Sequence, residues 1–182
     1  MENPVNSLLR TLRLRAVWVL ILPFFYFANP NPATLMWGFA VAFLGLAARA
    51  WAAGHIHKDE ELATGGPYAH TRNPLYLGSF LIGVGVTVAG AQPVFLVLFA
   101  VFFLGLYSAQ SRVEAEYLSE RFGDAYVRYS LNVPLLLPRP RPDPTPMERT
   151  SFTRTRYFLN REWEAGLGVL AGFAGLIAKL IY

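Results

Sequence analysis

The sequence predicts an all-α protein that crosses a membrane several times, with about five spans. Three observations support this fold class. Of the 182 residues, 54% are hydrophobic and 15% are charged, with a mean hydropathy of +0.33, which is too apolar for a soluble domain of this size. Several apolar runs approach the roughly 20 residues that a helix needs to cross a bilayer. The polar residues between these runs fall into a few segments.

The charged residues and the lack of cysteine narrow the possible functions. Without cysteine, the chain has no disulfide, no thiol nucleophile and no cysteine-based metal site. All Lys and Arg residues except Lys179 lie in the N-terminus, in residues 49–72 or in residues 110–161. The positive-inside rule places these three segments in the cytoplasm. We therefore expect an integral membrane protein whose active face is cytoplasmic and which binds no nucleic acid.

The first two predicted spans lie in the N-terminal third of the chain. Residues 16–28 form an apolar run that the leucines of the basic N-terminus extend into a helix. A basic start before a short apolar run is also typical of a signal peptide. However, the tight turn at residues 29–32, Asn-Pro-Asn-Pro, is a poor cleavage site and more apolar runs follow. We therefore expect a first span here and a second span over residues 33–53.

The next two apolar runs predict a helical hairpin. Residues 75–90 and 94–109 are separated by the uncharged turn Gln92-Pro93. In residues 110–133, apolar residues recur three or four positions apart among charged ones. This spacing predicts an amphipathic helix that continues the fourth span into the cytoplasm.

The C-terminal part of the chain differs in character from this core. Residues 134–146 hold six of the 13 prolines and cannot be helical. Residues 149–161 mix arginine with aromatic residues, which suits a membrane surface. Residues 165–182 form a fifth apolar run, rich in glycine and alanine, that either spans the bilayer or lies half-buried. We predict a core of four spans and an amphipathic helix over residues 1–140, followed by a linker and an apolar helix over residues 141–182.

The polar stretch before the third span predicts a binding site. Asn73 is a residue type that caps helices, and Pro74 suits the first helical position. A helix N-terminus attracts anions, and Arg72 adds a full positive charge beside it. Tyr68 and Tyr76 flank the stretch with aromatic rings. These residues predict a site for an anionic group; the alternative is an ordinary helix cap with Arg and Tyr as anchors at the membrane interface.

The predicted hairpin brings a carboxylate to this stretch. Asn73 begins the third span and Glu114 follows the fourth, so the two residues should be neighbours at one membrane edge. Opposite charges in one place suit a zwitterionic ligand, and we expect a cytoplasmic pocket for such a ligand there. The alternative is an ion pair that closes the hairpin.

A metal site is not expected. His55, His57 and Glu60 or Glu61 are the candidate ligands. Their spacing does not place two histidines on one face of a helix, and no fourth ligand is evident.

The same residues resemble a known family. The pattern Leu-Ala-Thr-Gly-Gly-Pro-Tyr at residues 62–68, the pattern Arg-Asn-Pro-Leu-Tyr-Leu-Gly at residues 72–78, and a later pattern from Glu114 to Pro134 are similar to the isoprenylcysteine carboxyl methyltransferase and phospholipid methyltransferase group. The resemblance covers residues 45–140. It implies an integral membrane methyltransferase that uses S-adenosylmethionine. The acceptor would be lipophilic, either the carboxylate of a prenylated cysteine-like group or a lipid amine.

The resemblance also implies which residues bind the cofactor. By motif position these are Leu62, Ala63, Tyr68, Asn73, Pro74, Leu75, Tyr76 and Glu114. The local charge adds Arg72 to the predicted binding residues.

The chain departs from the family pattern in three places. The common Arg-His-Pro is Arg-Asn-Pro here, at Asn73, and the usual pair of adjacent glutamates is Glu114-Ala115-Glu116. The arginine that engages the acceptor carboxylate in the isoprenylcysteine enzymes falls at Gln110. Arg112 lies close to that position but out of register.

Two residues are predicted to be catalytic. Arg112 is the nearest cation for an acceptor carboxylate. Glu116, or alternatively His70, would take the proton that an ammonium acceptor has to lose before methylation.

Two other functions stay open at this point. Membrane sterol reductases share a similar helix start and bind NADPH, whose phosphates call for several convergent cations. The hairpin offers Arg72, Arg112 and Lys58 beside several acidic residues, which favours a zwitterion. The other alternative is a non-catalytic membrane scaffold or lipid-binding protein of the same fold, to which Gln110 and Ala115 point.

Overall fold

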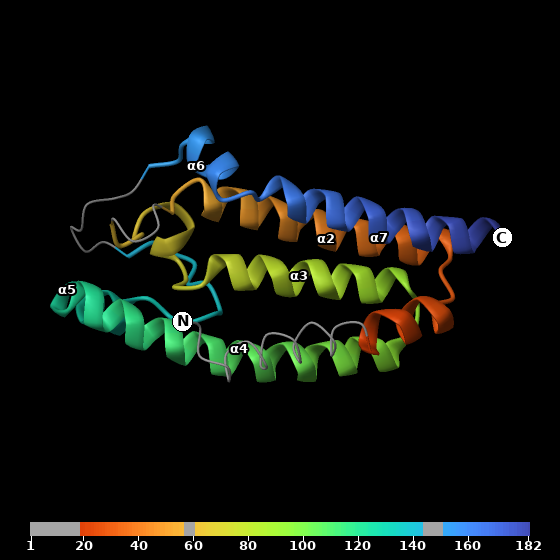
Figure 1. Ribbon diagram of the computed structural model, residues 1–182, viewed down its shortest axis with the longest axis horizontal. Helices are drawn as coiled ribbons and strands as arrows, with labels where there is room; N and C mark the ends of the chain where they lie inside the picture. Colours follow the sequence, from red (N-terminus) through yellow and green to blue (C-terminus); the bar gives the residue numbers. More distant parts are fainter. Residues whose placement is uncertain (1–18, 57–60, 144–150) are drawn as a thin grey trace, which may run out of the picture.

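The computed structural model describes residues 19–56, 61–143 and 151–182. Within these ranges every regular element is a helix: residues 19–27, α2 (Pro32–Ala53), the 3-10 helix η1 (Gly66–Ala69), α3 (Pro74–Ala89), α4 (Pro93–Phe122), α5 (Asp124–Asn132), α6 (Arg154–Leu159) and α7 (Trp163–Ile181). Figure 1 shows α2, α3, α4 and α7 running along the long axis, with α5 and α6 near one end and the C-terminus at the other. The predicted all-α fold is confirmed.

Three helices are long and apolar enough to cross a membrane: α2 with 22 residues, α4 with 30 and α7 with 19. α3 is also apolar but has 16 residues, about 24 Å of helix against a hydrocarbon core of about 30 Å. The protein is therefore a multi-pass membrane protein, as predicted. The predicted first span is described only from residue 19, where a helix runs to residue 27, and its N-terminal part lies outside the described residues, so the total of five spans stays a prediction.

Glycines let α2 and α3 approach each other closely. A Cβ added at Gly38 of α2 would lie 2.4 Å from the carbonyl oxygen of Gly85. A Cβ added at Gly45 would lie 2.6 Å from the carbonyl oxygen of Gly78. Because apolar burial does not drive helix association in lipid, such small-residue faces supply close packing instead. α2 thereby fixes the position at which α3 begins.

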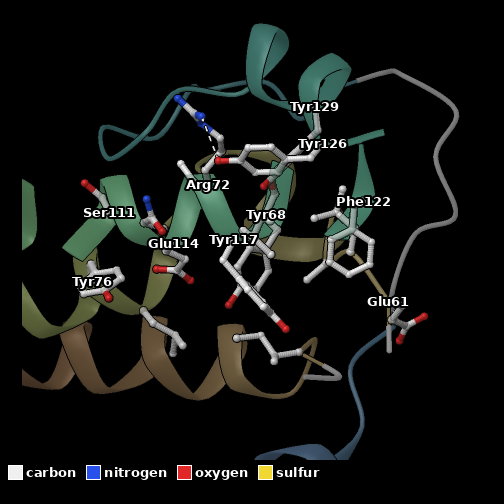
Figure 2. Close-up of a pocket in the computed structure, with 17 residues that line it drawn as sticks. Glu61, Tyr68, Arg72, Tyr76, Ser111, Glu114, Tyr117, Phe122, Tyr126 and Tyr129 are labelled. Atoms are coloured by element: carbon white, nitrogen blue, oxygen red, sulfur yellow. Dashed lines mark hydrogen bonds between the residues drawn. The ribbon is translucent and has the colours of Figure 1, made fainter. Parts of the chain in front are cut away.

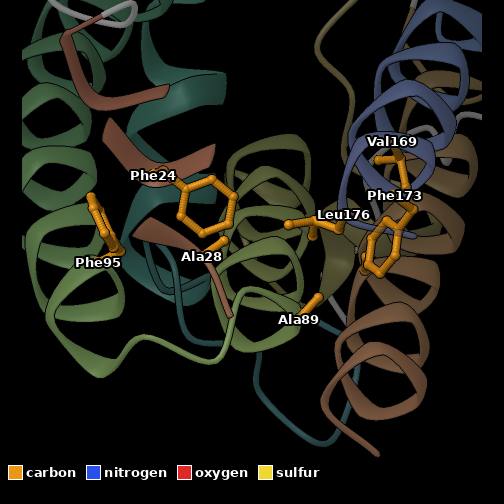
Figure 3. Packing of buried hydrophobic residues seen from close by; sticks show 8 residues of the cluster. Phe24, Ala28, Ala89, Phe95, Val169, Phe173 and Leu176 are labelled. Atoms are coloured by element: carbon orange, nitrogen blue, oxygen red, sulfur yellow. The ribbon is translucent and has the colours of Figure 1, made fainter. Parts of the chain in front are cut away.

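The C-terminal helix α7 shares the core of the preceding helices. Phe173 and Leu176 of α7 belong to one buried cluster with Ala42 of α2 and Ala89 of α3. Figure 3 shows α7 on one side of this cluster and Phe95 of α4 on the other. The predicted division of the chain into a core and a C-terminal part stays a prediction.

α3 and α4 form the predicted hairpin, with the turn at residues 90–92. A ladder of aromatic rings joins the two helices. The ring centre of Phe103 lies 5.3 Å from that of Phe80 and 6.1 Å from that of Tyr107. Tyr107 in turn lies 5.2 Å from Tyr76. The first turn of α3 is therefore held beside the later turns of α4.

The amphipathic stretch after the fourth span is two helices, so the prediction of one continuous helix is wrong. α4 ends at Phe122 and α5 begins at Asp124 because Gly123 has a φ of +51°, which glycine adopts at little cost. A Cβ at Gly123 would meet no atom within 4 Å, so the position needs glycine for its backbone conformation. After this break, Tyr126 and Tyr129 of α5 pack in a cluster with residues of α4 and of the loop before η1.

Residues 134–143 are not helical, as their prolines predict. They run beside the loop that leads into α3. The backbone N–H of Arg72 donates to the carbonyl of Pro134 at 2.9 Å, and the N–H of Arg139 donates to the carbonyl of His70 at 2.9 Å. This pairing fixes the conformation of the loop.

Candidate functional site

A cavity of about 290 Å³ lies where α3 begins. Its walls come from the loop between α2 and α3, the first turn of α3, the later turns of α4, and α5. The lining residues are Ile56, Glu61, Leu62, Ala63, Tyr68, Arg72, Asn73, Leu75, Tyr76, Ser111, Glu114, Ala115, Tyr117, Leu118, Phe122, Tyr126 and Tyr129. Figure 2 shows Tyr76, Ser111 and Glu114 at one end of the cavity and Phe122 and Glu61 at the other.

Most of the residues predicted to bind the cofactor line this cavity. They are Leu62, Ala63, Tyr68, Arg72, Asn73, Leu75, Tyr76 and Glu114. Pro74 is the exception, because it is buried at the start of α3 and does not line the cavity. Cofactor contact by any of these residues stays a prediction.

The two predicted catalytic residues lie away from the cavity. Arg112 and Glu116 are exposed and are not among the lining residues. Each is two positions from Glu114, and at 3.6 residues per turn two positions rotate a side chain by about 200° around the helix. With Glu114 toward the cavity, Arg112 and Glu116 therefore face away from it. The α4 residues that do line the cavity are Ser111, Glu114, Ala115, Tyr117, Leu118 and Phe122.

α3 begins at Pro74 with Asn73 at the N-cap position, as predicted, but the expectation that the Asn73 side chain caps the helix is wrong. The Asn73 side chain makes no capping hydrogen bond. Its Nδ2 donates instead to the hydroxyl of Tyr107 at 3.2 Å, and that hydroxyl donates to the carbonyl of Leu135 at 3.3 Å. Asn73 therefore ties the start of α3 to α4 and, through Tyr107, to the loop after α5.

Arg72 is the one basic residue among the described residues that line the cavity. Its Nη1 lies 3.5 Å from the hydroxyl of Tyr126, the contact that is dashed in Figure 2. Its Nε is buried and has no hydrogen-bond partner among the described residues. A buried, unpaired donor on a charged group is costly, but this Nε is closed off from the cavity as well as from solvent, so a ligand in the cavity does not reach it in this structure.

Glu114 is the carboxylate at the same end of the cavity. Its side chain is half-buried and shares a hydrogen bond with Tyr76, whose hydroxyl donates. Tyr76 belongs to the first turn of α3 and Glu114 to α4. Asn73, the residue predicted to be a neighbour of Glu114, lines the same cavity. The arrangement can hold one positive and one negative group of a ligand side by side, with Arg72 for the negative group.

Sequence reasoning assigned no role to the tyrosines of α5. The Tyr129 hydroxyl donates to the carbonyl of Tyr68 at 2.7 Å and thereby joins α5 to η1. Burial raises the pKa of the Tyr68 phenol and of the Tyr129 phenol, so both stay protonated donors. In the sequence, Tyr126 and Tyr129 were marked by their place in the later family pattern, from Glu114 to Pro134.

His55 and His70, the two histidines that the structure describes, lie outside the cavity. The Nδ1 atoms of His55 and His70 lie 2.8 and 2.9 Å from backbone carbonyl oxygens, and neither residue is in the lining. His57 and Glu60, two of the candidate metal ligands, lie outside the described residues. Among the residues that the structure describes, no three His, Cys, Asp or Glu side chains gather as metal ligands would.

Most of the residues that line this cavity belong to a part of the chain that matches a known protein family. The sequence model of the family described as Phospholipid methyltransferase matches residues 33–125. The chain belongs to this family. The resemblance predicted from the sequence is thereby confirmed. The family match includes α2, α3 and α4, whereas α6 and α7 lie beyond it.

Three known proteins are similar in sequence to parts of this chain. The Protein-S-isoprenylcysteine O-methyltransferase of Schizosaccharomyces pombe is 34% identical over 82 residues, 45% of this chain and 35% of the relative. That of Saccharomyces cerevisiae is 34% identical over 80 residues, 44% of this chain and 34% of the relative. The Cobalt-zinc-cadmium resistance protein CzcN of Cupriavidus metallidurans is 32% identical over 114 residues, 60% of this chain and 51% of the relative. The matches thus span about a third of the first two relatives and half of the third. No solved structure matches the chain.

Proposed function

We propose that the protein is a membrane methyltransferase that takes a methyl group from S-adenosylmethionine and transfers it to a lipophilic acceptor. The observation that carries the proposal is one cavity that combines Arg72 and Glu114 with apolar walls. Membership of the family supports the reaction. The two relatives named as isoprenylcysteine O-methyltransferases support the class of acceptor.

The charged end of the cavity suits the amino-acid part of S-adenosylmethionine, which carries an ammonium and a carboxylate. Glu114 would hold the ammonium, because hydrogen bonds between ionised partners are the strong ones. Arg72 would hold the carboxylate, because it is the one cation among the described residues that line the cavity. The donors and acceptors at this end therefore fit the zwitterion.

The other end of the cavity suits a nucleoside. Phe122 lies at this end (Figure 2), and Leu62 and Leu118 pack against the same cluster as Phe122. Such apolar and aromatic surfaces pack against a planar base. The volume of about 290 Å³ lies near the lower limit of about 300 Å³ for small-molecule sites. The cavity therefore fits a ligand that is charged at one end and flat and apolar at the other.

The acceptor that best suits this cavity is a lipid-borne carboxylate. When bound, S-adenosylmethionine supplies an electrophilic methyl group on a positively charged sulfur. The protein then has to hold the reacting atoms in line and exclude water. A carboxylate acceptor needs no base, whereas an ammonium acceptor must first lose a proton. Arg112 and Glu116 have no support as catalytic residues because both are exposed outside the cavity. A lipid amine is the second acceptor class, in line with the name of the family.

We also propose that the cavity opens to the cytoplasm. Arg72, Arg112, Arg121 and Arg128 belong to the end of the molecule that carries α5 and the start of α3, and the turn at residues 90–92 at the other end is uncharged. Basic residues favour the cytoplasmic side of a membrane.

The alternative functions have less support. NADPH carries three phosphates, whereas the described lining residues offer one cation, Arg72, beside the carboxylates of Glu61 and Glu114. Membership of the Phospholipid methyltransferase family favours an enzyme over a non-catalytic protein of the same fold.

Calorimetric titration of the purified protein with S-adenosylmethionine and, separately, NADPH tests the proposal. We expect saturable binding of S-adenosylmethionine alone, weakened about tenfold or more in Glu114→Gln, since the amide keeps an acceptor oxygen but loses the charge that pairs with the ammonium. Glu120→Gln is the matched control, because Glu120 lies on the same helix, is exposed and does not line the cavity. Binding of NADPH alone would indicate a reductase, and binding of neither would indicate the non-catalytic alternative. Transfer of labelled methyl to a prenylated cysteine analogue or to a lipid with an amine headgroup then identifies the acceptor.

A further inference from the structure

The segment of residues 151–162, which includes α6, lies beyond the family match but contacts the end of α2 beside the cavity. The N–H of Thr153 donates to the carbonyl of Gly54 at 2.9 Å. Nδ2 of Asn160 donates to the carbonyl of Ala53 at 2.9 Å. The last carbonyls of a helix have no partner within the helix, so this segment supplies partners at the C-terminal end of α2.

Aromatic contacts extend this support toward η1. A Cβ at Gly54 would lie 2.2 Å from the ring of Phe152, and one at Gly66 would lie 2.3 Å from Nε2 of His55. The rings of His55 and Phe152 are themselves 6.0 Å apart in an edge-on arrangement. Phe152 therefore packs on His55, and His55 packs on η1, which carries the cavity residue Tyr68.

The most direct contact with the cavity is an ion pair. Nη2 of Arg156 in α6 lies 2.6 Å from Oε1 of Glu61, and Glu61 lines the cavity. The Arg156 side chain is 20% exposed and that of Glu61 is 38% exposed. Arg156 thus holds a carboxylate in one place while leaving it accessible. Figure 2 shows Glu61 at the end of the cavity opposite Glu114.

We propose that Glu61 is a specificity-determining residue that accepts hydrogen bonds from the ribose hydroxyls of the bound nucleoside, and that Arg156 is the residue that positions it. The inference rests on the proposed function, which puts the nucleoside at the end of the cavity away from Glu114. A carboxylate accepts hydrogen bonds through two oxygens, so it can engage a pair of neighbouring hydroxyls while the Arg156 guanidinium fixes its orientation. The C-terminal segment is then part of the cofactor site.

The test compares the affinity of the full-length protein for S-adenosylhomocysteine and for its 2′-deoxy form, both measured by calorimetry. We expect the unmodified protein to bind S-adenosylhomocysteine about tenfold more tightly than the 2′-deoxy form, as one hydrogen bond to a charged group predicts. In Glu61→Gln and Arg156→Gln this ratio should fall to about two or less. Arg154→Gln, the same change at an exposed position of the same short helix, should keep the ratio.

A double variant, Glu61→Arg with Arg156→Glu, separates ligand binding from structural support. A purely structural pair would be restored by the exchange, together with the affinity for S-adenosylhomocysteine. The proposal predicts that the exchange restores the melting temperature but not the tenfold ratio. Recovery of both would overturn it, as would an unchanged ratio in the two single variants. If the unmodified protein bound neither compound, the proposed function would fail together with this inference.

Discussion

Arg49 of α2 and Glu162, the residue before α7, form a bidentate ion pair. Nε of Arg49 lies 2.9 Å from Oε2 of Glu162, and Nη2 lies 2.8 Å from Oε1. The remaining nitrogen, Nη1, donates to the hydroxyl of Ser79 in α3 at 2.5 Å. One guanidinium therefore joins α2, α3 and the start of α7, near the end of the bundle that carries the cavity.

Removing this carboxylate should destabilise the protein. In Glu162→Gln, Arg49 keeps its charge but loses its ionised partner, and the pair is largely shielded, with side-chain exposures of 22% and 8%. Breaking a buried pair costs about 3 kcal/mol or more, which should appear as a clear fall in the melting temperature in detergent. Glu164→Gln is the control, because Glu164 and its partner Arg161 are exposed and such pairs contribute about 0–1 kcal/mol. Equal melting temperatures for the two variants would contradict the prediction.

The contact between α2 and α3 should not tolerate an added methyl group. In Gly38→Ala the new Cβ would lie 2.4 Å from a backbone oxygen of α3, so the helices must separate, at a cost of roughly 1–3 kcal/mol. Gly172→Ala in α7 is the control, because a Cβ there meets nothing within 4 Å. Alanine is also the better helix former, by up to about 1 kcal/mol. Thermal unfolding should therefore show a lower melting temperature for Gly38→Ala and a higher one for Gly172→Ala. A higher melting temperature for Gly38→Ala would show that α2 and α3 pack more loosely than described.

The spans and the hairpin could be predicted because their causes are local. Apolar length marks α2, α4 and α7, and Pro74 and Pro93 mark where α3 and α4 begin. The end of α4 was missed because the spacing of apolar residues continues across Gly123. One residue with a positive φ interrupts the helix without changing the periodicity on either side.

The sequence predicted the residues of the candidate site only where a family motif or the hairpin between α3 and α4 determines their position. Arg112 and Glu116 were chosen from their place in a motif, whereas the angle around α4 decides which residues face the cavity. The pairing of Glu61 with Arg156 joins residues 95 positions apart. It depends on how a segment outside the family match docks on α2, and no local pattern encodes that contact.

The buried tyrosines should make the protein sensitive to alkaline pH. Burial raises the pKa of Tyr68 and of Tyr129 above the ordinary phenol value, which is about 10. The unfolded chain therefore releases these protons at lower pH than the folded one. Their contribution to stability is complete below about pH 10 and is lost as the pH rises from there through the raised values.

Melting temperatures between about pH 8 and pH 11 measure this loss. Tyr129→Phe should lower the melting temperature at the neutral end, since the hydrogen bond to the Tyr68 carbonyl contributes about 1 kcal/mol. The melting temperature of this variant should also fall less steeply as the pH rises, because one titrating group has been removed. Tyr182→Phe, at a fully exposed position, should change neither quantity. A decline of equal steepness in Tyr129→Phe would show that this phenol does not contribute to it.

The proposed orientation predicts opposite labelling at the two ends of the molecule. Leu131 in α5 is 80% exposed and Tyr182 is fully exposed, and Figure 1 shows α5 and the C-terminus at opposite ends. Because the chain has no cysteine, Leu131→Cys and Tyr182→Cys each introduce a single thiol. In sealed vesicles of known orientation, an impermeant maleimide should label Leu131→Cys only from the cytoplasmic side and Tyr182→Cys only from the other side. Labelling of both from one side would mean that α7 does not cross the bilayer, and a full reversal would place the cavity on the non-cytoplasmic face.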